Sequence, residues 1–177
     1  VIINGYNSDK DSEKIRSLIG YVGHNSLLYG DLSGYDNLRF FCSFYPDIDF
    51  KKQFEYLSEI LNLSHLIRQK VAKLSHGEKK RLSIMKAMMS NPSVLIMDEP
   101  DAGLDANSIN NLTEFFFPKV INGNITVFLT THNSDFALSV ASIMGILQLG
   151  KIEFQTQDIQ QFSKVISKYQ LINESVL

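Results

Sequence analysis

The sequence has few of the features that are typical of disulfide-bonded, membrane-spanning and nucleic-acid-binding proteins. Its single cysteine, Cys42, excludes an internal disulfide and fits a reducing compartment. No apolar run approaches the roughly 20 residues that a membrane-spanning helix needs. The formal net charge is only −2 and the pI is about 6.1, so no basic field favours a nucleic-acid partner. A membrane, if one matters, would be reached through a partner.

The 177 residues, 44% of them hydrophobic, are enough for one domain with a substantial core. Short apolar stretches typical of strands alternate with helical patterns, which predicts an α/β layer fold with a mostly parallel sheet. The strands are expected at residues 1–3, 19–23, 94–97 and 125–132, and as a pair within 143–154. A long helical block, residues 33–90, looks like an insertion, and a single helix is expected at 106–116.

Two adjacent acids, Asp98 and Glu99, directly follow the apolar strand "VLIM". The carboxyl ends of parallel strands form the ligand-binding edge of such sheets, so the acids are expected to emerge there. Asp98 suits a phosphate-bound Mg²⁺, which takes one or two carboxylates, and Glu99 suits the activation of an attacking water. The alternative is a strand-end pair that serves only as a helix cap or as surface charge.

The stretch "LSHGEKKRL", residues 74–82, predicts a helix start. Ser75 followed by Glu78 is a capping box, and Gly77 allows another backbone to approach closely. A helix start with a hydroxyl and a glycine can also bind an anion, although a purely structural cap explains the same residues. His132 closes the strand "ITVFLTTH" at the same predicted edge as the acids, and it is either structural or a contact to the same ligand.

These pieces, in this order, resemble the ATP-binding cassette (ABC) family of transporter ATPases. "LSHGE" is similar to the family's signature motif, "VLIMDE" to its Walker B strand and "AGLD" to its D-loop. His132 resembles the switch histidine, and "YVGHN" lies where the glutamine loop is expected. The resemblance implies a P-loop NTPase (RecA-like) core with an inserted helical subdomain.

The resemblance also implies a division of labour around ATP and Mg²⁺. Asp98 would hold Mg²⁺ through water, Glu99 would polarise the hydrolytic water, and His132 would contact the γ-phosphate. The ATP held by a second ATPase subunit would be bound by the signature motif, with Asp105 across the dimer seam. The implied nucleotide-binding residues are thus Ser75, Gly77, Glu78, Asp105 and His24.

Two departures from the family pattern are histidines. His24 stands where the glutamine loop has glutamine, and neutral histidine offers one acceptor nitrogen to a metal-bound water. His76 replaces the first glycine of the signature, and tolerance is expected because Ser75 and Gly77 remain. The histidine in the loop, with "LSGYDNLRFF" after it, gives a weaker resemblance to the ATPase subunit of the heme exporter of cytochrome c maturation.

The third departure is that the sequence contains no Walker A phosphate loop, G-x-x-x-x-G-K-[ST]. "GILQLGKI", residues 145–152, has both glycines and Lys151, but Ile152 replaces the required hydroxyl, and a hairpin turn explains the segment better. With Val1 as the first residue, we expect the chain to lack the N-terminal strands and phosphate-loop helix of the cassette. We therefore expect these 177 residues alone to bind MgATP weakly or not at all and to be inactive.

The expected organisation is one partial ATPase domain in four parts: core residues 1–32, a helical subdomain 33–90, core residues 91–157 and a C-terminal helix 158–177. The implied protein drives transport from the cytoplasmic face of the cell membrane, where it binds a transmembrane permease subunit. Candidates for that contact are Leu27, Leu28, Tyr29 and Tyr35, with core packing an equal alternative. The alternative functions are a soluble ABC-family ATPase not coupled to transport and a non-catalytic dimerisation module.

Overall fold

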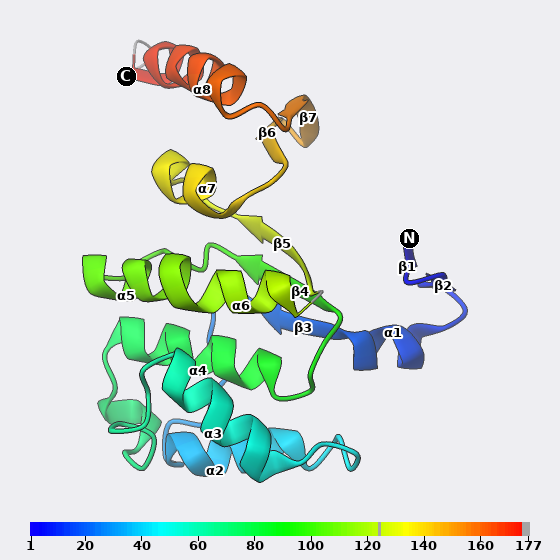
Figure 1. The fold of residues 1–177 in the computed structure, drawn as a ribbon, viewed down its shortest axis with the longest axis vertical. Coiled ribbons are helices and arrows are strands. Elements are labelled where there is room, and N and C mark those ends of the chain that lie inside the picture. Colours follow the sequence, from blue (N-terminus) through cyan, green and yellow to red (C-terminus); the bar gives the residue numbers. More distant parts are fainter. Residues whose placement is uncertain (124, 175–177) are drawn as a thin grey trace. The chain divides into compact units, whose positions relative to one another are not determined.

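A three-stranded parallel sheet lies at the centre of residues Val1–Thr131 (Figure 1). The computed structural model describes residues 1–123 and 125–174. The sheet has the order β3 (Ile19–Val22), β4 (Val94–Asp98) and β5 (Thr126–Thr130). Ile19 pairs with Val94, and Val94 pairs with Thr126. The parallel order confirms the α/β class that the sequence predicts.

The helix α4 (His76–Met88) packs against β3 on one face of this sheet. Gly20 permits the close approach, because a Cβ atom there would lie 2.6 Å from the carbonyl oxygen of Ala87. Val22, Leu95 and Met97 are fully buried on the same face. Burial of these apolar side chains is what holds the helix to the sheet.

A second helical stretch runs alongside α4 and contacts β5. The sequence predicts one helix over 106–116, whereas the structure continues further, as α5 (Ala106–Asn111), the π-helical η2 (Leu112–Phe116) and α6 (Phe117–Asn122). The wider π turn changes the angular spacing of the side chains, and both Phe116 and Phe117 are buried. The prediction therefore ended the helix too early.

The segment between β3 and β4 is helical, as predicted. It contains α2 (Gly34–Cys42), α3 (Phe50–Ile60), the short 3₁₀ helix η1 (Val71–Lys73) and α4. Tyr35 packs edge-on against Phe50 and Phe54, with ring centroids 5.4 and 5.2 Å apart. The guanidinium of Arg68 lies 3.9 Å from the centre of the Tyr35 ring. These contacts join α2 to α3.

The N-terminal strand lies in a small hairpin whose second strand was not among the strands expected from the sequence. β1 (Ile2–Ile3) pairs antiparallel with β2 (Tyr6–Asn7) in a hairpin that is separate from the parallel sheet. Asn4 and Gly5 form the turn with φ values of 48° and 82°, the left-handed geometry that an Asn-Gly pair favours in tight hairpins. The helix α1 (Ser12–Leu18) then leads into β3, as the sequence predicts.

The chain from His132 onward forms a second compact unit. It contains α7 (Ser134–Val140), the antiparallel pair β6 (Met144–Gln148) and β7 (Lys151–Thr156), and α8 (Ile159–Glu174). Leu149 and Gly150 form the β6–β7 turn, which confirms that "GILQLGKI" is a hairpin. Residues 175–177 of the predicted C-terminal helix lie outside the described residues, and the four-part domain division stays a prediction. Among the helices described, none is both long and apolar enough to cross a bilayer.

Candidate functional site

The acid pair lies at the carboxyl end of β4, as the sequence predicts. Asp98 is the last residue of the strand, and its Oδ1 accepts a hydrogen bond from the Thr130 hydroxyl at 2.7 Å. The Glu99 backbone N–H donates to the Thr130 carbonyl at 3.0 Å. Both acids are half-buried. Thr130, the last residue of the neighbouring β5, thus fixes the start of the turn that carries both carboxylates.

Glu99 adopts a left-handed backbone conformation, with φ of 47°. This conformation costs an ordinary side chain on the order of 1–2 kcal/mol and persists only where the surroundings enforce it. It turns the chain sharply away from the strand direction immediately after Asp98. Strained residues of this kind concentrate at functional sites, which favours a chemical role for Glu99 over a role as plain surface charge.

A third acid, Asp101, belongs to the same turn and was not among the residues that the sequence singled out. It is buried, and its Oδ1 accepts a hydrogen bond from the Thr131 hydroxyl at 2.8 Å. The sequence feature that could have indicated Asp101 is the additional acid in "DEPD", together with the two threonines of "LTTH". Asp101 and Thr131 add a second side-chain link between the turn and the segment after β5.

The start of α4 has the predicted capping box. The Ser75 hydroxyl accepts from the Glu78 N–H at 3.2 Å, and the Glu78 carboxylate accepts from the Ser75 N–H at 2.7 Å. The Glu78 side chain therefore has a structural partner, and its role in nucleotide binding stays a prediction. Ser75 is exposed at the helix start, where a second acceptor or an anion can reach its hydroxyl.

The first turn of α4 contacts the loop that follows the acid pair. A Cβ atom on Gly77 would lie 3.3 Å from the Leu104 side chain and 4.0 Å from the Gly103 carbonyl oxygen, so the close neighbour is a side chain rather than the backbone that the sequence predicts. The His76 imidazole lies against Gly103, where a Cβ atom would be 2.6 Å from its Nδ1. Gly103 has a φ of 70°, which glycine adopts readily. The signature-like and D-loop-like segments are thus in direct contact within one chain.

Asp105 caps α5. Its Oδ1 accepts from the Ser108 N–H at 2.8 Å. Hydrogen bonds from the side chain and then the backbone of Ser108 hold the pKa of Asp105 below its usual value. The residue is therefore an ionised N-cap at neutral pH, and its predicted role at a dimer seam stays a prediction.

His24 lies near the first turn of α4. It is exposed and lines a pocket of about 180 Å³ with Asn25, Ser26, His76, Lys79 and Lys80. The loop is fastened to α4, because the Ser26 carbonyl accepts from Ser83 at 3.2 Å and from Lys86 at 3.0 Å. Both histidines that depart from the family pattern thus line one pocket.

Two lysines of α4 have lowered pKa values. Burial lowers the pKa of Lys86. Burial also lowers the pKa of Lys80, against the opposing pull of the nearby carboxylates of Asp98, Glu99 and Asp101. Lys80 was not singled out from the sequence, where the "KKR" run reads as a solvated helix face.

His132 is the first residue of the second unit, two residues beyond the end of β5. Its predicted contact with the γ-phosphate stays a prediction.

The donor set at the sheet edge fits Mg²⁺ of the kind that accompanies a nucleotide. Within the described part of the chain, no group of three or more His, Cys, Asp or Glu residues could form a complete metal cage. A nucleotide-bound Mg²⁺ does not need one, because phosphate oxygens and waters supply most of its ligands. The carboxylate of Asp98, held at one oxygen by Thr130, is a suitable single ligand.

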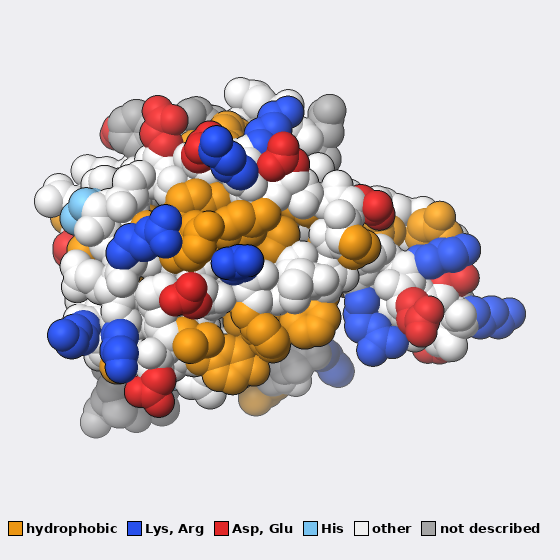
Figure 2. All heavy atoms as spheres, turned by 90° about the horizontal axis from the view of Figure 1, so that it is seen from below, with side chains coloured by type: hydrophobic (Ala, Val, Ile, Leu, Met, Phe, Trp, Pro, Cys, Tyr) orange, Lys and Arg blue, Asp and Glu red, His pale blue; other side chains and the backbone are white. Residues whose placement is uncertain are grey.

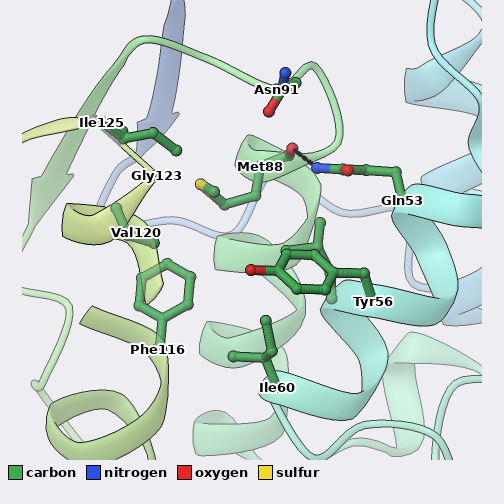
Figure 3. Close-up of a pocket in the computed structure, with 10 residues that line it drawn as sticks. Gln53, Tyr56, Ile60, Met88, Asn91, Phe116, Val120, Gly123 and Ile125 are labelled. Atoms are coloured by element: carbon green, nitrogen blue, oxygen red, sulfur yellow. Dashed lines mark hydrogen bonds between the residues drawn. The ribbon is translucent and has the colours of Figure 1, made fainter. Parts of the chain in front are cut away.

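A second cavity, of about 110 Å³, lies between α3, the end of α4 and the η2–α6 stretch (Figure 3). Phe116, Val120 and Met88 contribute apolar walls, and Gln53 donates to the Met88 carbonyl at 2.9 Å. Asn91 and Ile125, which also line it, precede β4 and β5. The cavity is therefore at the amino ends of the strands, the edge opposite the acids, and is not part of the candidate site.

Comparisons with known proteins agree with this geometry. The sequence pattern described as ABC transporter matches residues 1–102. The linearmycin resistance ATP-binding protein LnrL of Bacillus subtilis is 30% identical over 155 residues. The molybdenum import ATP-binding protein ModC of Paramagnetospirillum magneticum is 29% identical over 134 residues, 76% of this chain.

A solved structure with the same fold is the ATP-binding cassette MJ0796, a dimer in a post-hydrolysis state bound to ADP and Pi. It has a TM-score of 0.78 at 22% identity, over 88% of this chain and 71% of that one. This likeness confirms the predicted cassette fold.

The chain spans about half the length of LnrL, with 86% of the chain matching 49% of that protein, and it matches 37% of ModC. The family pattern covers more than half of the chain and includes the signature-like segment and the acid pair. The chain therefore belongs to the ABC transporter family.

Proposed function

We propose that this chain supplies the signature motif and the catalytic acids of an ABC transporter ATPase. The protein hydrolyses ATP as a dimer in which each nucleotide lies between two subunits, and it drives transport through a permease. Asp98 holds Mg²⁺ and Glu99 orients and polarises the attacking water. Ser75 and Gly77 bind the γ-phosphate of the ATP held by the opposite subunit, and Asp105 lies at the seam.

One observation carries this proposal: the D-loop-like segment that follows the acid turn (residues 98–101) packs on the first turn of α4, and Lys80 on the second turn of α4 reaches the acid turn itself. Gly77 packs on Leu104, His76 lies on Gly103, and Lys80 donates to the Asp98 carbonyl. The proposed catalytic acids and the proposed phosphate-binding helix start thus lie on packed segments of one chain. ATP held between two subunits needs both parts, the acids from one copy and the helix start from the other.

Two further roles belong to histidines. His24 faces the pocket beside α4 and could accept a hydrogen bond from a metal-bound water through one ring nitrogen. His132 contacts the γ-phosphate of the bound ATP. Mg²⁺, when bound, neutralises the charge of the phosphates, while the residues of this chain position the water and the second subunit.

The direct test is ATP turnover by the full-length gene product with Glu99→Gln. The change keeps the size and polarity of the side chain but removes the base, so kcat is expected to fall by about 10²- to 10⁴-fold. Glu114→Gln is the matched control, because Glu114 is exposed on η2 away from the acid turn. Unchanged turnover in Glu99→Gln would remove Glu99 from its role. A wild-type protein without ATPase activity would favour the non-catalytic dimerisation module.

An exposed aromatic cluster on the helical segment suits the permease. Phe40 lies edge-on to Tyr29 and to Phe44, with ring centroids 5.5 and 5.3 Å apart, and Phe44 is 64% exposed. Figure 2 shows hydrophobic side chains gathered on the face seen from below, with lysine and arginine side chains around them. Leu27, in the loop before Tyr29, is 66% exposed. An exposed apolar patch of this kind marks an interaction surface.

Of the four residues suggested by the sequence, Leu27 and Tyr29 are exposed, and Leu28 is half-buried. Tyr35 is half-buried and instead packs among Phe50, Phe54 and Arg68. We infer that the permease contacts the cluster formed by Leu27, Tyr29, Phe40 and Phe44, and we propose the cytoplasmic face of the membrane as the location of the subunit.

The contact is tested by co-purification of the full-length gene product with its membrane fraction. Phe40→Ser and Phe44→Ser together are expected to release the protein from membranes without loss of basal ATP turnover. Ile121→Ser is the control, because Ile121 is exposed on α6 rather than on the cluster. Unchanged membrane recovery in the double variant would mean that a different surface contacts the permease, and a wild-type protein absent from the membrane fraction would favour the soluble ABC ATPase instead.

A further inference from the structure

Lys80 is unusual because its side chain is buried although it belongs to the charged run "KKR". It lies on the second turn of α4, and only 5% of its surface is exposed. Lysine is rarely buried unless its ammonium is paired, because removing that charge from water is costly. A specific partner must therefore account for its position.

The partner is the acid turn. The Lys80 ammonium donates to the main-chain carbonyl of Asp98 at 3.4 Å. The carboxylates of Asp98, Glu99 and Asp101 act on the same ammonium electrostatically. The carbonyl in question belongs to the peptide that joins Asp98 to Glu99, so its orientation is linked to the left-handed φ of Glu99.

The helix that carries Lys80 is also fastened to the His24 loop. Ser83 and Lys86, one and two turns further along α4, both donate to the Ser26 carbonyl. Lys80 itself lines the pocket that His24 shares with His76. The helix α4 thus contacts two segments: Ser83 and Lys86 hold the His24 loop, and Lys80 holds the acid turn.

We propose that Lys80 is a positioning residue that fixes the Asp98–Glu99 peptide through the Asp98 carbonyl and ties the acid pair to α4. The hydrogen bond keeps Glu99 in its strained conformation, so that both carboxylates stay at the ligand edge. Movement of α4 relative to the sheet then changes the position of the acids. The effect on turnover rests on the proposed function, whereas the effect on the acid turn does not.

The test uses two variants and two readouts on the full-length gene product. Lys80→Met keeps the length of the side chain but cannot donate, and Lys80→Gln is neutral but keeps an N–H donor. Hydrogen–deuterium exchange of the Glu99 amide, measured without nucleotide, reports the acid turn. That amide is expected to exchange about tenfold faster or more in Lys80→Met, the factor expected for loss of a charge-assisted hydrogen bond.

Turnover provides the second readout. In Lys80→Met, kcat is expected to fall by about ten- to hundredfold, as when a residue that orients a metal ligand is lost, while KM for ATP stays close to wild type. Lys80→Gln is expected to recover most of the lost rate and the slow exchange. Lys51→Met is the control, because it removes the same charge from an exposed lysine of α3 that does not line the His24 pocket.

The possible outcomes distinguish the positioning role of Lys80 from the proposed ATPase function. Wild-type exchange and kcat in Lys80→Met would overturn the positioning role, and so would equal losses in Lys80→Met and Lys80→Gln, since charge alone would then matter. If Lys80→Met does not fold, the ¹⁵Nζ resonance of Lys80 in the wild-type protein decides: slow exchange of its protons supports a held ammonium, and rapid exchange refutes it. A protein that hydrolyses no ATP, yet shows the predicted exchange pattern, contradicts the proposed function and not this inference.

Discussion

The two faces of the parallel sheet differ sharply in this chain. On one face, Val22, Leu95 and Met97 are fully buried beneath helices that include α4. On the other face, the register places Tyr21 beside Ile96 and Ile96 beside Phe128, yet Tyr21 is 53% and Phe128 is 64% exposed. Parallel strands are normally covered on both faces.

The difference separates the origin of stability from the origin of function. The covered face supplies the burial that holds α4 and the sheet together, and α4 in turn presents Lys80 to the acid turn. The open face carries apolar side chains that contribute little to folding within the described residues. Substitutions on the two faces should therefore have different consequences.

The largest effect is expected on the covered face. Met97→Ala removes a buried side chain next to α4 and leaves a cavity, so the free energy of unfolding should fall by about 2–5 kcal/mol. Urea denaturation of the 177-residue chain measures this. A loss below about 1 kcal/mol would mean that the covered face does not carry the stability of the sheet.

A smaller loss is expected where β3 meets α4. Gly20→Ala places a Cβ atom 2.6 Å from the Ala87 carbonyl, which forces the helix and the strand apart at a cost of about 1–3 kcal/mol. The same denaturation experiment measures it. Gly145→Ala in the β6 strand is the control, because a Cβ atom there would lie 3.4 Å from the Phe154 carbonyl oxygen, an ordinary contact distance; a comparable loss there would contradict the close-packing argument.

The helix that covers the sheet should be weakened by loss of its cap. Ser75→Ala removes the hydroxyl that accepts from the Glu78 N–H, at a cost of about 1 kcal/mol. Ser75→Asp retains an acceptor at the N-cap and is expected to recover the stability. If Ser75→Asp were as unstable as Ser75→Ala, the cap would not be the cause.

The smallest effect is expected on the open face. Phe128→Thr should change the free energy of unfolding of the 177-residue chain by no more than about 0.5 kcal/mol, because the ring is mostly exposed and threonine favours strands. It should also lower the binding of a hydrophobic dye. A loss as large as that of Met97→Ala would abolish the contrast between the faces.

The sequence predicts much of the fold because several signals are local. The apolar run before Asp98 predicts β4, the Ser75–Glu78 spacing predicts the capping box, and the pair of strands expected within 143–154 predicts a hairpin. Each of these depends on neighbours within a few residues. Their geometry therefore follows from the order of residue types.

The missed features depend on partners far away in the chain. The hydrogen bond of Lys80 to Asp98 spans 18 residues, and that of Thr131 to Asp101 spans 30. The charged run "KKR" does not indicate that Lys80 is buried. The left-handed conformation of Glu99 and the π turn before Phe117 are likewise products of packing, which the local sequence does not encode.

In the proposed dimer, one ATP lies between the acid turn of one copy and the start of α4 of the other copy. Analytical ultracentrifugation of the full-length gene product with Glu99→Gln tests this, because the variant binds ATP without consuming it. The predicted result is a dimer with MgATP, a monomer without nucleotide, and no ATP-dependent dimer when Ser75→Arg is added. A Glu99→Gln protein that binds MgATP yet stays monomeric would contradict the account.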